Sequence, residues 1–369
     1  MRDHSSLRDL LADHTISAAP ELCIREEDGT VQCLACANRC RIHDGKTGIC
    51  CVRMNRAGEL RVPGGYVAGL NIDPIEKKPF FHVFPGRDAL SFGMLGCNFH
   101  CPFCQNWVSS QVLKDHESTG KPHPIRAEQL ANKAVEENTP VIVSTYNEPL
   151  ITADWAAKVF ERACENGLVC GFVSNGNATP EVIEFLRPFM QIYKVDLKCF
   201  DDDGYRELGG KLKSVLDTIS LLKEKGFWVE VVTLLVPGFN DSEQQLRGMA
   251  GFLAGISHDI PWHVTAFHPD YQMTDARPTR PSDIERAVTI GKEAGLRFIY
   301  SGNLPGSTGN LENTYCHSCG GLLIERRGFF ILGNRMQGGH CPDCSALIPG
   351  MWEANPPRKT AGAAPRRAW

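Results

Sequence analysis

Short apolar segments rich in β-branched residues alternate with segments of helical periodicity between about residues 89 and 300. The apolar segments predict strands at Ala89–Leu95, Val141–Tyr146, Leu168–Ser174, Ile192–Leu197, Trp228–Val236, Trp262–Phe267 and Arg297–Tyr300. The segments between them predict helices at Ala127–Glu137, Ala153–Glu165, Glu181–Phe189, Lys213–Lys225, Gln244–Leu253 and Asp283–Ala294. This alternation predicts an α/β fold with a parallel sheet and right-handed crossovers. It fits a partial or complete βα barrel, and a doubly wound open sheet is the alternative, because the pattern does not contain the strand order.

The pattern changes on both sides of this region. Before it, the apolar residues Leu7, Leu10 and Leu11 predict one short amphipathic helix, and a cysteine-rich loop and a connector rich in glycine and proline follow. After it come a glycine-rich segment with more cysteines and a basic tail, which we expect to be disordered because it has little apolar sequence. The expected units are an N-terminal helical segment, a cysteine-rich metal-binding motif with its connector, the barrel, a ribbon with four cysteines and the tail, at 1–30, 31–88, 89–305, 306–353 and 354–369.

The composition excludes several classes of protein. The chain has 369 residues, of which 42% are hydrophobic and 22% charged, as in soluble globular proteins. The net charge of -4 gives no general attraction for polyanions, so we expect no nucleic-acid partner. The first residues carry charges where a signal peptide has an apolar run, and no stretch approaches the ~18 apolar residues of a membrane span. We therefore expect a cytoplasmic protein with no membrane partner.

The 16 cysteines are the unusual feature of the composition. A chain of this length can bury a core without disulfides, and disulfide scaffolds are short secreted chains. Twelve of the cysteines fall into three clusters, at positions 33, 36, 40, 50 and 51, at 97, 101 and 104, and at 316, 319, 341 and 344. In a reducing compartment, clusters of this kind indicate thiolate ligands for metals. The four scattered thiols, at 23, 164, 170 and 199, are expected to be ordinary buried cysteines.

The central cluster, Cys97-x3-Cys101-x2-Cys104, follows the first predicted strand. Its thiolates fall within eight residues and can wrap one inorganic cluster. A cubane has four irons, so three protein ligands leave one iron with an open coordination site, which a catalytic cluster needs. The position also agrees, because parallel βα folds gather function at the carboxyl ends of strands. A zinc site with a distant fourth ligand is the alternative.

With this triplet the chain resembles the radical S-adenosylmethionine (radical SAM) superfamily. The resemblance implies a partial (β/α)6 barrel in which the open iron of a 4Fe–4S cluster at Cys97, Cys101 and Cys104 chelates S-adenosylmethionine. It implies reductive cleavage of the sulfonium to a 5′-deoxyadenosyl radical that abstracts hydrogen, an oxidoreductase-like chemistry carried by the cofactor. It also implies an electron donor of the flavodoxin or ferredoxin type.

The same resemblance implies cofactor contacts at later strand ends. Glu148 occupies the place of the glutamate that binds the methionine amino group, although Tyr146 and Asn147 replace the glycines before it. The segment Lys194–Lys198 matches the Asp-Leu-Lys stretch of glycyl-radical activases, whose lysine contacts the carboxylate of the cofactor. The candidate cofactor-binding residues are Phe103, Asn147, Glu148, Ser174, Asn175, Asp196, Lys198, Val236, His263 and His268. Val173 stands where activases have an aspartate that helps to hold a monovalent cation, which argues against that site.

The two outer cysteine clusters predict accessory metal sites. Cys33, Cys36, Cys40 and Cys50 can hold either zinc or a second iron–sulfur cluster, with the adjacent Cys51 spare. Cys50 is the expected fourth ligand by resemblance. The paired spacing of Cys316, Cys319, Cys341 and Cys344 is similar to a zinc ribbon, so zinc is favoured there. A structural zinc could fold this glycine-rich segment, which has little core of its own.

The order of the motifs resembles the radical SAM enzyme of the AmmeMemoRadiSam system, close to pyruvate formate-lyase activating enzymes. The resemblance covers about residues 30–350 and implies hydrogen abstraction from a protein or peptide partner. Two alternatives are radical modification of a small molecule and, from another class, a non-catalytic zinc-binding interaction protein. Cys97, Cys101, Cys104 and Glu148 argue against the last of these.

Overall fold

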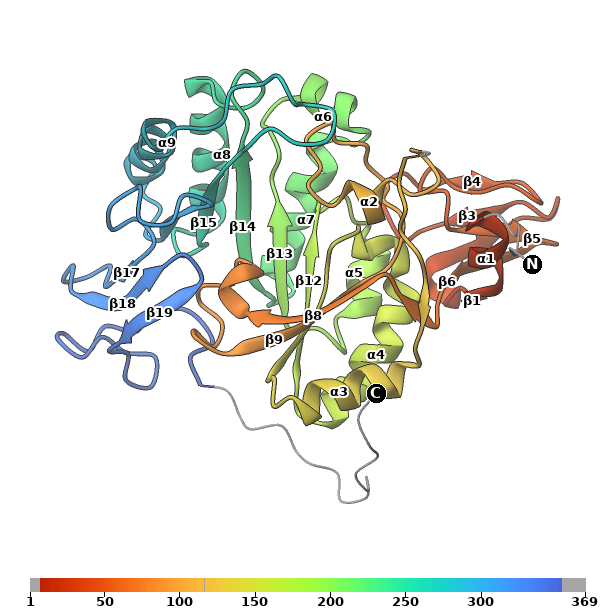
Figure 1. Cartoon of the computed structure of the whole chain (residues 1–369), viewed down its shortest axis with the longest axis horizontal. Coiled ribbons are helices and arrows are strands. Elements are labelled where there is room, and N and C mark those ends of the chain that lie inside the picture. Colours follow the sequence, from red (N-terminus) through yellow and green to blue (C-terminus); the bar gives the residue numbers. More distant parts are fainter. Residues whose placement is uncertain (1–6, 116, 354–369) are drawn as a thin grey trace.

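A central sheet of eight strands organises the computed structural model, which describes residues 7–115 and 117–353 (Figure 1). Seven strands are parallel: β9 (Asp88–Gly93), β11 (Val141–Ser144), β12 (Val169–Ser174), β13 (Ile192–Asp196), β14 (Trp228–Leu235), β15 (Trp262–Ala266) and β16 (Ile299–Gly302). They lie side by side in the order of the chain. A doubly wound sheet reverses its strand order at a switch point, so this uninterrupted order excludes the open-sheet alternative. The partial-barrel prediction is confirmed.

Helices connect the parallel strands and pack against the outer face of the sheet (Figure 1). They are α3 (Ala127–Glu136), α4 (Ala153–Glu165), α5 (Pro180–Leu186), α6 (Asp202–Leu208), α7 (Leu212–Glu224), α8 (Glu243–Ile256) and α9 (Pro281–Glu293). Local sequence explains several starts: the Thr179 side chain caps α5 ahead of Pro180, and Ser242 caps α8. The largest cluster of buried apolar residues lies between these helices and the strands.

The connector contributes a strand that the sequence pattern does not predict. Strand β8 (Gly69–Pro74) pairs antiparallel with β9 and forms one edge of the sheet, whereas β16 forms the other. Within the described residues these two edge strands are not paired with each other, so the sheet does not close. Strand β8 is half-exposed and bounded by glycine and proline, which explains why its sequence reads as a connector.

The cysteine-rich N-terminal region forms small antiparallel sheets beside α4 and α5 (Figure 1). One joins β1 (Thr15–Ser17), β6 (Glu59–Pro63) and β5 (Met54–Arg56), and another joins β2 (Cys23–Arg25), β3 (Val31–Cys33) and β4 (Arg41–Ile42). The short pair β7 (Tyr66–Val67) and β10 (His123–Pro124) completes this side. The amphipathic helix expected near the start of the chain is α1 (Leu7–Asp13).

The C-terminal ribbon is a three-stranded sheet of β17 (Thr314–Tyr315), β18 (Leu322–Arg327) and β19 (Phe330–Asn334). Arg326 of β18 is buried and donates to the Phe81 carbonyl (2.8 Å) and to Thr314 Oγ1 (2.6 Å). Next to Phe81, His82 packs on Trp228 and Phe298, which places this contact at the amino-terminal ends of β14 and β16. The ribbon therefore covers the end of the sheet opposite to the strands' carboxyl ends.

Two sequence-based expectations concern membranes and the tail. Within the described part of the chain, no helix is both long and apolar enough to cross a membrane. The tail expected at 354–369 lies outside the described residues.

Candidate functional site

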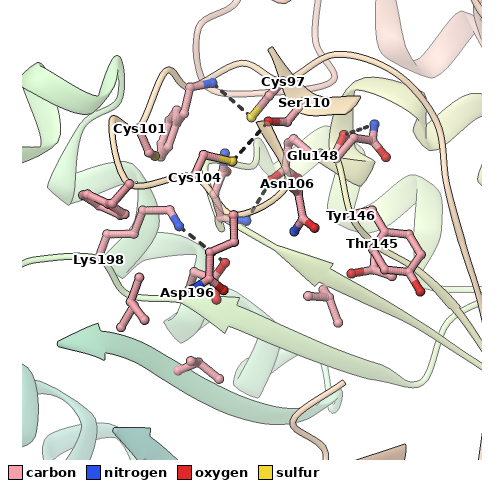
Figure 2. Close-up of a pocket in the computed structure, with 18 of the residues that line it drawn as sticks. Cys97, Cys101, Cys104, Asn106, Ser110, Thr145, Tyr146, Glu148, Asp196 and Lys198 are labelled. Atoms are coloured by element: carbon pink, nitrogen blue, oxygen red, sulfur yellow. Dashed lines mark hydrogen bonds and ion pairs between the residues drawn. The ribbon is translucent and has the colours of Figure 1, made fainter. Parts of the chain in front are cut away.

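A cavity of ≈ 250 Å³ opens at the carboxyl ends of the sheet strands. The loops after β9, β11, β12, β13 and β16 all contribute to its wall. Figure 2 shows the three central cysteines on one side of the cavity, two charged residues of β13 and its loop below them, and Tyr146 on the opposite side. The groups with acid–base or ligand chemistry in the wall include Cys97, Cys101, Cys104, Glu148, Asp196 and Lys198.

The loop after β9 carries the three thiols and is held from behind by its own continuation. Lys114 Nζ donates to the carbonyls of Cys97 (2.6 Å) and Phe99 (3.1 Å), and the short helix α2 (Trp107–Ser110) lies between. The Phe99 amide lies 3.4 Å from Cys97 Sγ, and Cys104 Sγ lies 3.2 Å from Ser110 Oγ. Burial raises the pKa of Cys101 to about 11 and raises the pKa of Cys97 as well. A bound metal would favour the thiolate forms of Cys97 and Cys101, so metal binding there releases their protons.

Glu148 presents a buried carboxylate to the same cavity. It follows β11 and caps the 3-10 helix η3 (Pro149–Thr152) by accepting from the Leu150 amide. It also accepts from Ser174 Oγ (2.7 Å) and from the Asn175 amide (2.7 Å), both at the end of β12. Burial raises the pKa of Glu148 to about 7, although these donors lower it. The arrangement suits a cationic ligand, since a cation would stabilise the ionised form.

Asp196 and Lys198 form a charged pair on the next strand. Burial alone would raise the pKa of Asp196, but Lys194 and Lys198 lower it below its usual range. Burial alone would lower the pKa of Lys198, but Asp196 and the Cys101 thiol raise it. Asp196 Oδ2 lies 3.4 Å from Lys198 Nζ, and its other oxygen contacts Lys194 Nζ. Both groups are thus charged, and Lys198 is available to an anionic ligand beside the cysteine loop.

The other candidate contacts divide by position. Phe103, Asn147 and Asn175 line the cavity, and Ser174 lies behind Glu148 as its hydrogen-bond donor. Val236, His263 and His268 do not line it. His268 contacts it indirectly, because its ring lies 3.1 Å from Nε2 of the lining residue Gln105.

His263 lies deeper in the barrel than the cavity. Its Nε2 is 2.7 Å from Glu230 Oε2, and both side chains are buried. The His263 ring packs against Phe81 and Tyr300. Period-two alternation places His263 and Thr265 on one face of β15, and only Thr265 reaches the cavity. Val236 packs in the core, where its amide donates to Asn240 Oδ1. These two side chains are therefore not among the residues that line the cavity.

Sequence reasoning missed several residues of the site. Tyr146 lines the cavity with a left-handed backbone (φ +70), and its hydroxyl lies 3.0 Å from Lys78 Nζ and 3.0 Å from Ser91 Oγ. Its neighbour Gly93 has no room for a Cβ, which would lie 2.8 Å from that of Tyr146. The departure from glycine at position 146 was the available signal. Lys114 had none, because its partners are backbone carbonyls.

The four C-terminal cysteines come together as a compact group. Cys316 and Cys344 Sγ are 3.6 Å apart, Cys319 and Cys341 Sγ are 3.7 Å apart, and all four lie within 4.8 Å of one another. The adjacent His317 and His340 do not belong to the group. The described residues thus contain here a set of sulfur ligands that could hold one metal ion.

The chain is similar to several known proteins. The model of the radical SAM superfamily matches residues 93–250. The uncharacterized protein MJ0808 of Methanocaldococcus jannaschii is 38% identical over 302 residues, which are 81% of this chain and 89% of that protein. The pyruvate formate-lyase-activating enzyme of Clostridium pasteurianum is 22% identical over 209 residues, 52% of this chain and 84% of that protein. A crystal structure of a radical SAM methyltransferase from Sphaerobacter thermophilus aligns with a TM-score of 0.46 at 15% identity, over 84% of this chain and 81% of that one.

Proposed function

The chain belongs to the radical SAM superfamily and is homologous to pyruvate formate-lyase-activating enzymes, and from this premise we propose that it cleaves S-adenosylmethionine reductively. The cleavage takes place at a 4Fe–4S cluster bound by Cys97, Cys101 and Cys104. The hydrogen abstracted afterwards comes from a protein or peptide partner. The observation that carries the proposal is that three thiols of one loop share a cavity with Glu148 and the Asp196–Lys198 pair.

The residues present fit this cofactor. The three cysteines come from one loop whose carbonyls are held by Lys114, and the cavity beside them leaves space for a ligand on the fourth iron. When bound, the cluster supplies one electron to the sulfonium of S-adenosylmethionine, and the resulting 5′-deoxyadenosyl radical abstracts hydrogen.

The chain's own groups bind and orient the cofactor. Glu148 accepts hydrogen bonds from the methionine ammonium, for which its ionised form is needed. Lys198 binds the methionine carboxylate within the same cavity, and Asp196 keeps that lysine charged. Phe103 and Val232 add apolar wall to the cavity, which limits the access of water.

The activating-enzyme homologue supports a protein or peptide as the hydrogen donor. The sheet supports it as well, because its unpaired edges β8 and β16 leave the barrel incompletely closed within the described residues. We place the chain in the AmmeMemoRadiSam branch, with a flavodoxin- or ferredoxin-like protein as the electron donor. The proposed units are the barrel at 89–305 and the ribbon at 306–353.

We propose zinc as the metal of the ribbon. A tetrahedral site with Zn–S bonds of ≈ 2.3 Å places its sulfurs about 3.8 Å apart. The observed 3.6 and 3.7 Å agree with that spacing and exceed a disulfide's S–S bond of about 2.05 Å. Cys319 and Cys344 are exposed, so this site lies close to solvent. We propose a structural role for the ion there.

The experiment that tests the function measures 5′-deoxyadenosine after anaerobic reconstitution and reduction with dithionite. We expect production by the wild type and by Cys164→Ala, whose thiol lies in α4 away from the cavity, and loss of at least 100-fold in Cys101→Ala. Equal production by Cys101→Ala would contradict the assignment. For the substrate, deuterium transfer into 5′-deoxyadenosine from a labelled candidate protein, compared with labelled small molecules, separates the two substrate classes.

A further inference from the structure

The thiols of the first cysteine cluster are largely buried beside the sheet β2-β3-β4. Cys33, Cys36 and Cys50 are each 5 to 6% exposed, and Cys40 is half-buried. Cys33 interacts electrostatically with each of the other three, and Cys40 Sγ lies 3.4 Å from the position of a Cβ at Gly48. The segment that carries Cys33, Cys36 and Cys40 and the segment that carries Cys50 therefore lie next to each other with their thiols facing.

The backbone around these thiols is arranged for thiolates. The amide two residues after each buried cysteine faces its sulfur: Ala35 for Cys33, Asn38 for Cys36 and Val52 for Cys50. The same arrangement occurs at Phe99 for Cys97 and at Ser318 for Cys316. Amide donors stabilise the charged form of a ligand, so this group has the local geometry of the other two metal-ligating clusters.

Buried hydrogen-bond donors without acceptors concentrate around the cysteines of the first cluster. Arg53 is 1% exposed and pairs with Asp154 through Nη1 (2.7 Å), while its Nε and Nη2 have no partner. It interacts with Cys33 and Cys50. Asn98 Nδ2 has no acceptor within hydrogen-bonding distance but points toward Cys36. The Ala37 amide between Cys36 and Asn38 donates to the Asn177 carbonyl (2.9 Å), so Asn38 and Asn177 flank the same segment. Of the ten buried side-chain atoms without partners in the described residues, five belong to these four residues: Asn38 Nδ2, Arg53 Nε, Arg53 Nη2, Asn98 Nδ2 and Asn177 Nδ2.

All five of these orphaned atoms are N–H donors. A buried donor without an acceptor costs about 1–3 kcal/mol, so their concentration indicates a ligand rich in acceptors. An iron–sulfur cluster adds inorganic sulfides to its four thiolates and accepts such bonds, which tune its potential. A zinc ion adds no acceptor.

The first cluster also touches the catalytic loop. Gly96, which precedes Cys97, lies so close that a Cβ there would be 3.2 Å from the Cys50 carbonyl and 2.9 Å from the Val52 side chain. Asn98 lies between Cys36 and Asn175, to which its Oδ1 is joined at 2.7 Å. Gly96 and Asn98, the two residues that flank Cys97, therefore lie directly beside residues of the first cluster.

We propose that Cys33, Cys36, Cys40 and Cys50 bind a second iron–sulfur cluster that relays electrons to the catalytic one. The relay role rests on the function proposed above; the cluster itself does not. In each turnover, an external one-electron reductant of the flavodoxin or ferredoxin class gives one electron to the second cluster. That cluster passes the electron to the catalytic cluster and returns to its oxidised state. The buried donors stabilise its more negative, reduced form.

The first test counts iron and acid-labile sulfide after anaerobic reconstitution. The variant with Cys97→Ala, Cys101→Ala and Cys104→Ala should keep about four irons and four sulfides per chain and give an EPR signal on reduction. Adding Cys36→Ala and Cys50→Ala should remove both. Zinc without sulfide at the first cluster overturns the proposal. Should the triple variant fail to fold, the wild type decides: about eight irons support two clusters, and about four overturn the second.

The second test measures the reduction potential of the remaining cluster in the triple variant. Asn98→Ala removes a donor that points at Cys36, so the potential should become more negative. The control is Asn166→Ala, a buried amide at the end of α4 that donates to the Arg162 carbonyl. Equal potentials for Asn98→Ala and the parent, or an equal shift in both variants, contradict the role of the donor.

The third test addresses the relay. In Cys33→Ala/Cys36→Ala, 5′-deoxyadenosine formation driven by reduced flavodoxin should fall at least tenfold, while dithionite, a small reductant, should still drive it. Equal rates with flavodoxin overturn the relay. If the protein holds two clusters but does not cleave S-adenosylmethionine, the proposed function is refuted and the second cluster stands. If it cleaves S-adenosylmethionine with one cluster, the second cluster is refuted and the proposed function stands.

Discussion

Two carboxylates in one cavity have pKa values shifted in opposite directions. Glu148 has only neutral donors around it, so burial dominates and its pKa is raised to about 7. Asp196 has Lys194 and Lys198 beside it, so its pKa is lowered although burial opposes that shift. The sequence motif identifies both residues but not this difference, which depends on neighbours from three strands.

The raised pKa of Glu148 predicts a pH-dependent affinity for S-adenosylmethionine. Below pH 7 the carboxyl group is protonated in the free protein and cannot accept from the ammonium with a full charge. The affinity should therefore rise as the pH increases from 6 to 7.5, by up to about tenfold per pH unit below the pKa. Equilibrium dialysis under anaerobic conditions measures it.

The matched variant is Glu148→Gln, which keeps the size of the side chain and cannot ionise. It should bind at least tenfold more weakly at pH 7.5 and show no dependence on Glu148 between pH 6 and 7.5. An unchanged pH profile in this variant would show that another group titrates.

At the scale of elements, the cysteine loop depends on a close fit against helix α6 and the turn after it. The Phe99 ring packs against Gly210, where a Cβ would lie 2.3 Å from the ring, and the His100 amide donates to the Leu208 carbonyl. The sequence predicts the loop and its ligands but not α6, which is short and begins at an Asp201 cap. The position of the cysteine loop therefore depends on packing between segments that are distant in the sequence.

Gly210→Ala should disturb the packing of the cysteine loop against the turn after α6. The added methyl group must displace Phe99, whose carbonyl is held by Lys114, at a cost of about 1–3 kcal/mol in the free energy of unfolding. We expect a lower Tm and a lower iron content after reconstitution. Gly251→Ala is the control, because nothing lies within 4 Å of its Cβ position in α8, and the change should stabilise the protein by about 1 kcal/mol. Equal iron contents in the two variants would argue against a role of the contact between Phe99 and Gly210 in positioning the cysteine loop.

At the scale of the whole molecule, a buried cation joins the ribbon to the barrel. Arg326 stacks 4.4 Å from the Phe81 ring centroid, and its Nε lies 3.9 Å from Glu76 Oε1. Burial raises the pKa of Glu76, and Arg326 opposes that shift. The contact links residues about 250 positions apart and makes the ribbon part of the barrel's closed end.

Arg326→Met should destabilise the protein by about 3–5 kcal/mol, because it leaves Glu76 buried without its cation. Glu76→Gln in the same chain should recover part of this loss, since the amide carries no charge. Chemical denaturation measures both. If the double variant is no more stable than Arg326→Met, the charge of Glu76 is not the cause.

The parallel α/β core and the three groups of candidate cysteine ligands follow from the sequence alone. Helical and strand periodicities are local, and ligands of one loop, such as Cys97, Cys101 and Cys104, must be close in the chain to wrap one cluster. The antiparallel edge strand β8, the left-handed Tyr146 and the depth of His263 depend instead on tertiary packing. So do the donors around Cys36 and the contact of Arg326 with Phe81. These features arise where segments remote in the sequence pack together, and burial there sets distances and charge states that no local pattern contains.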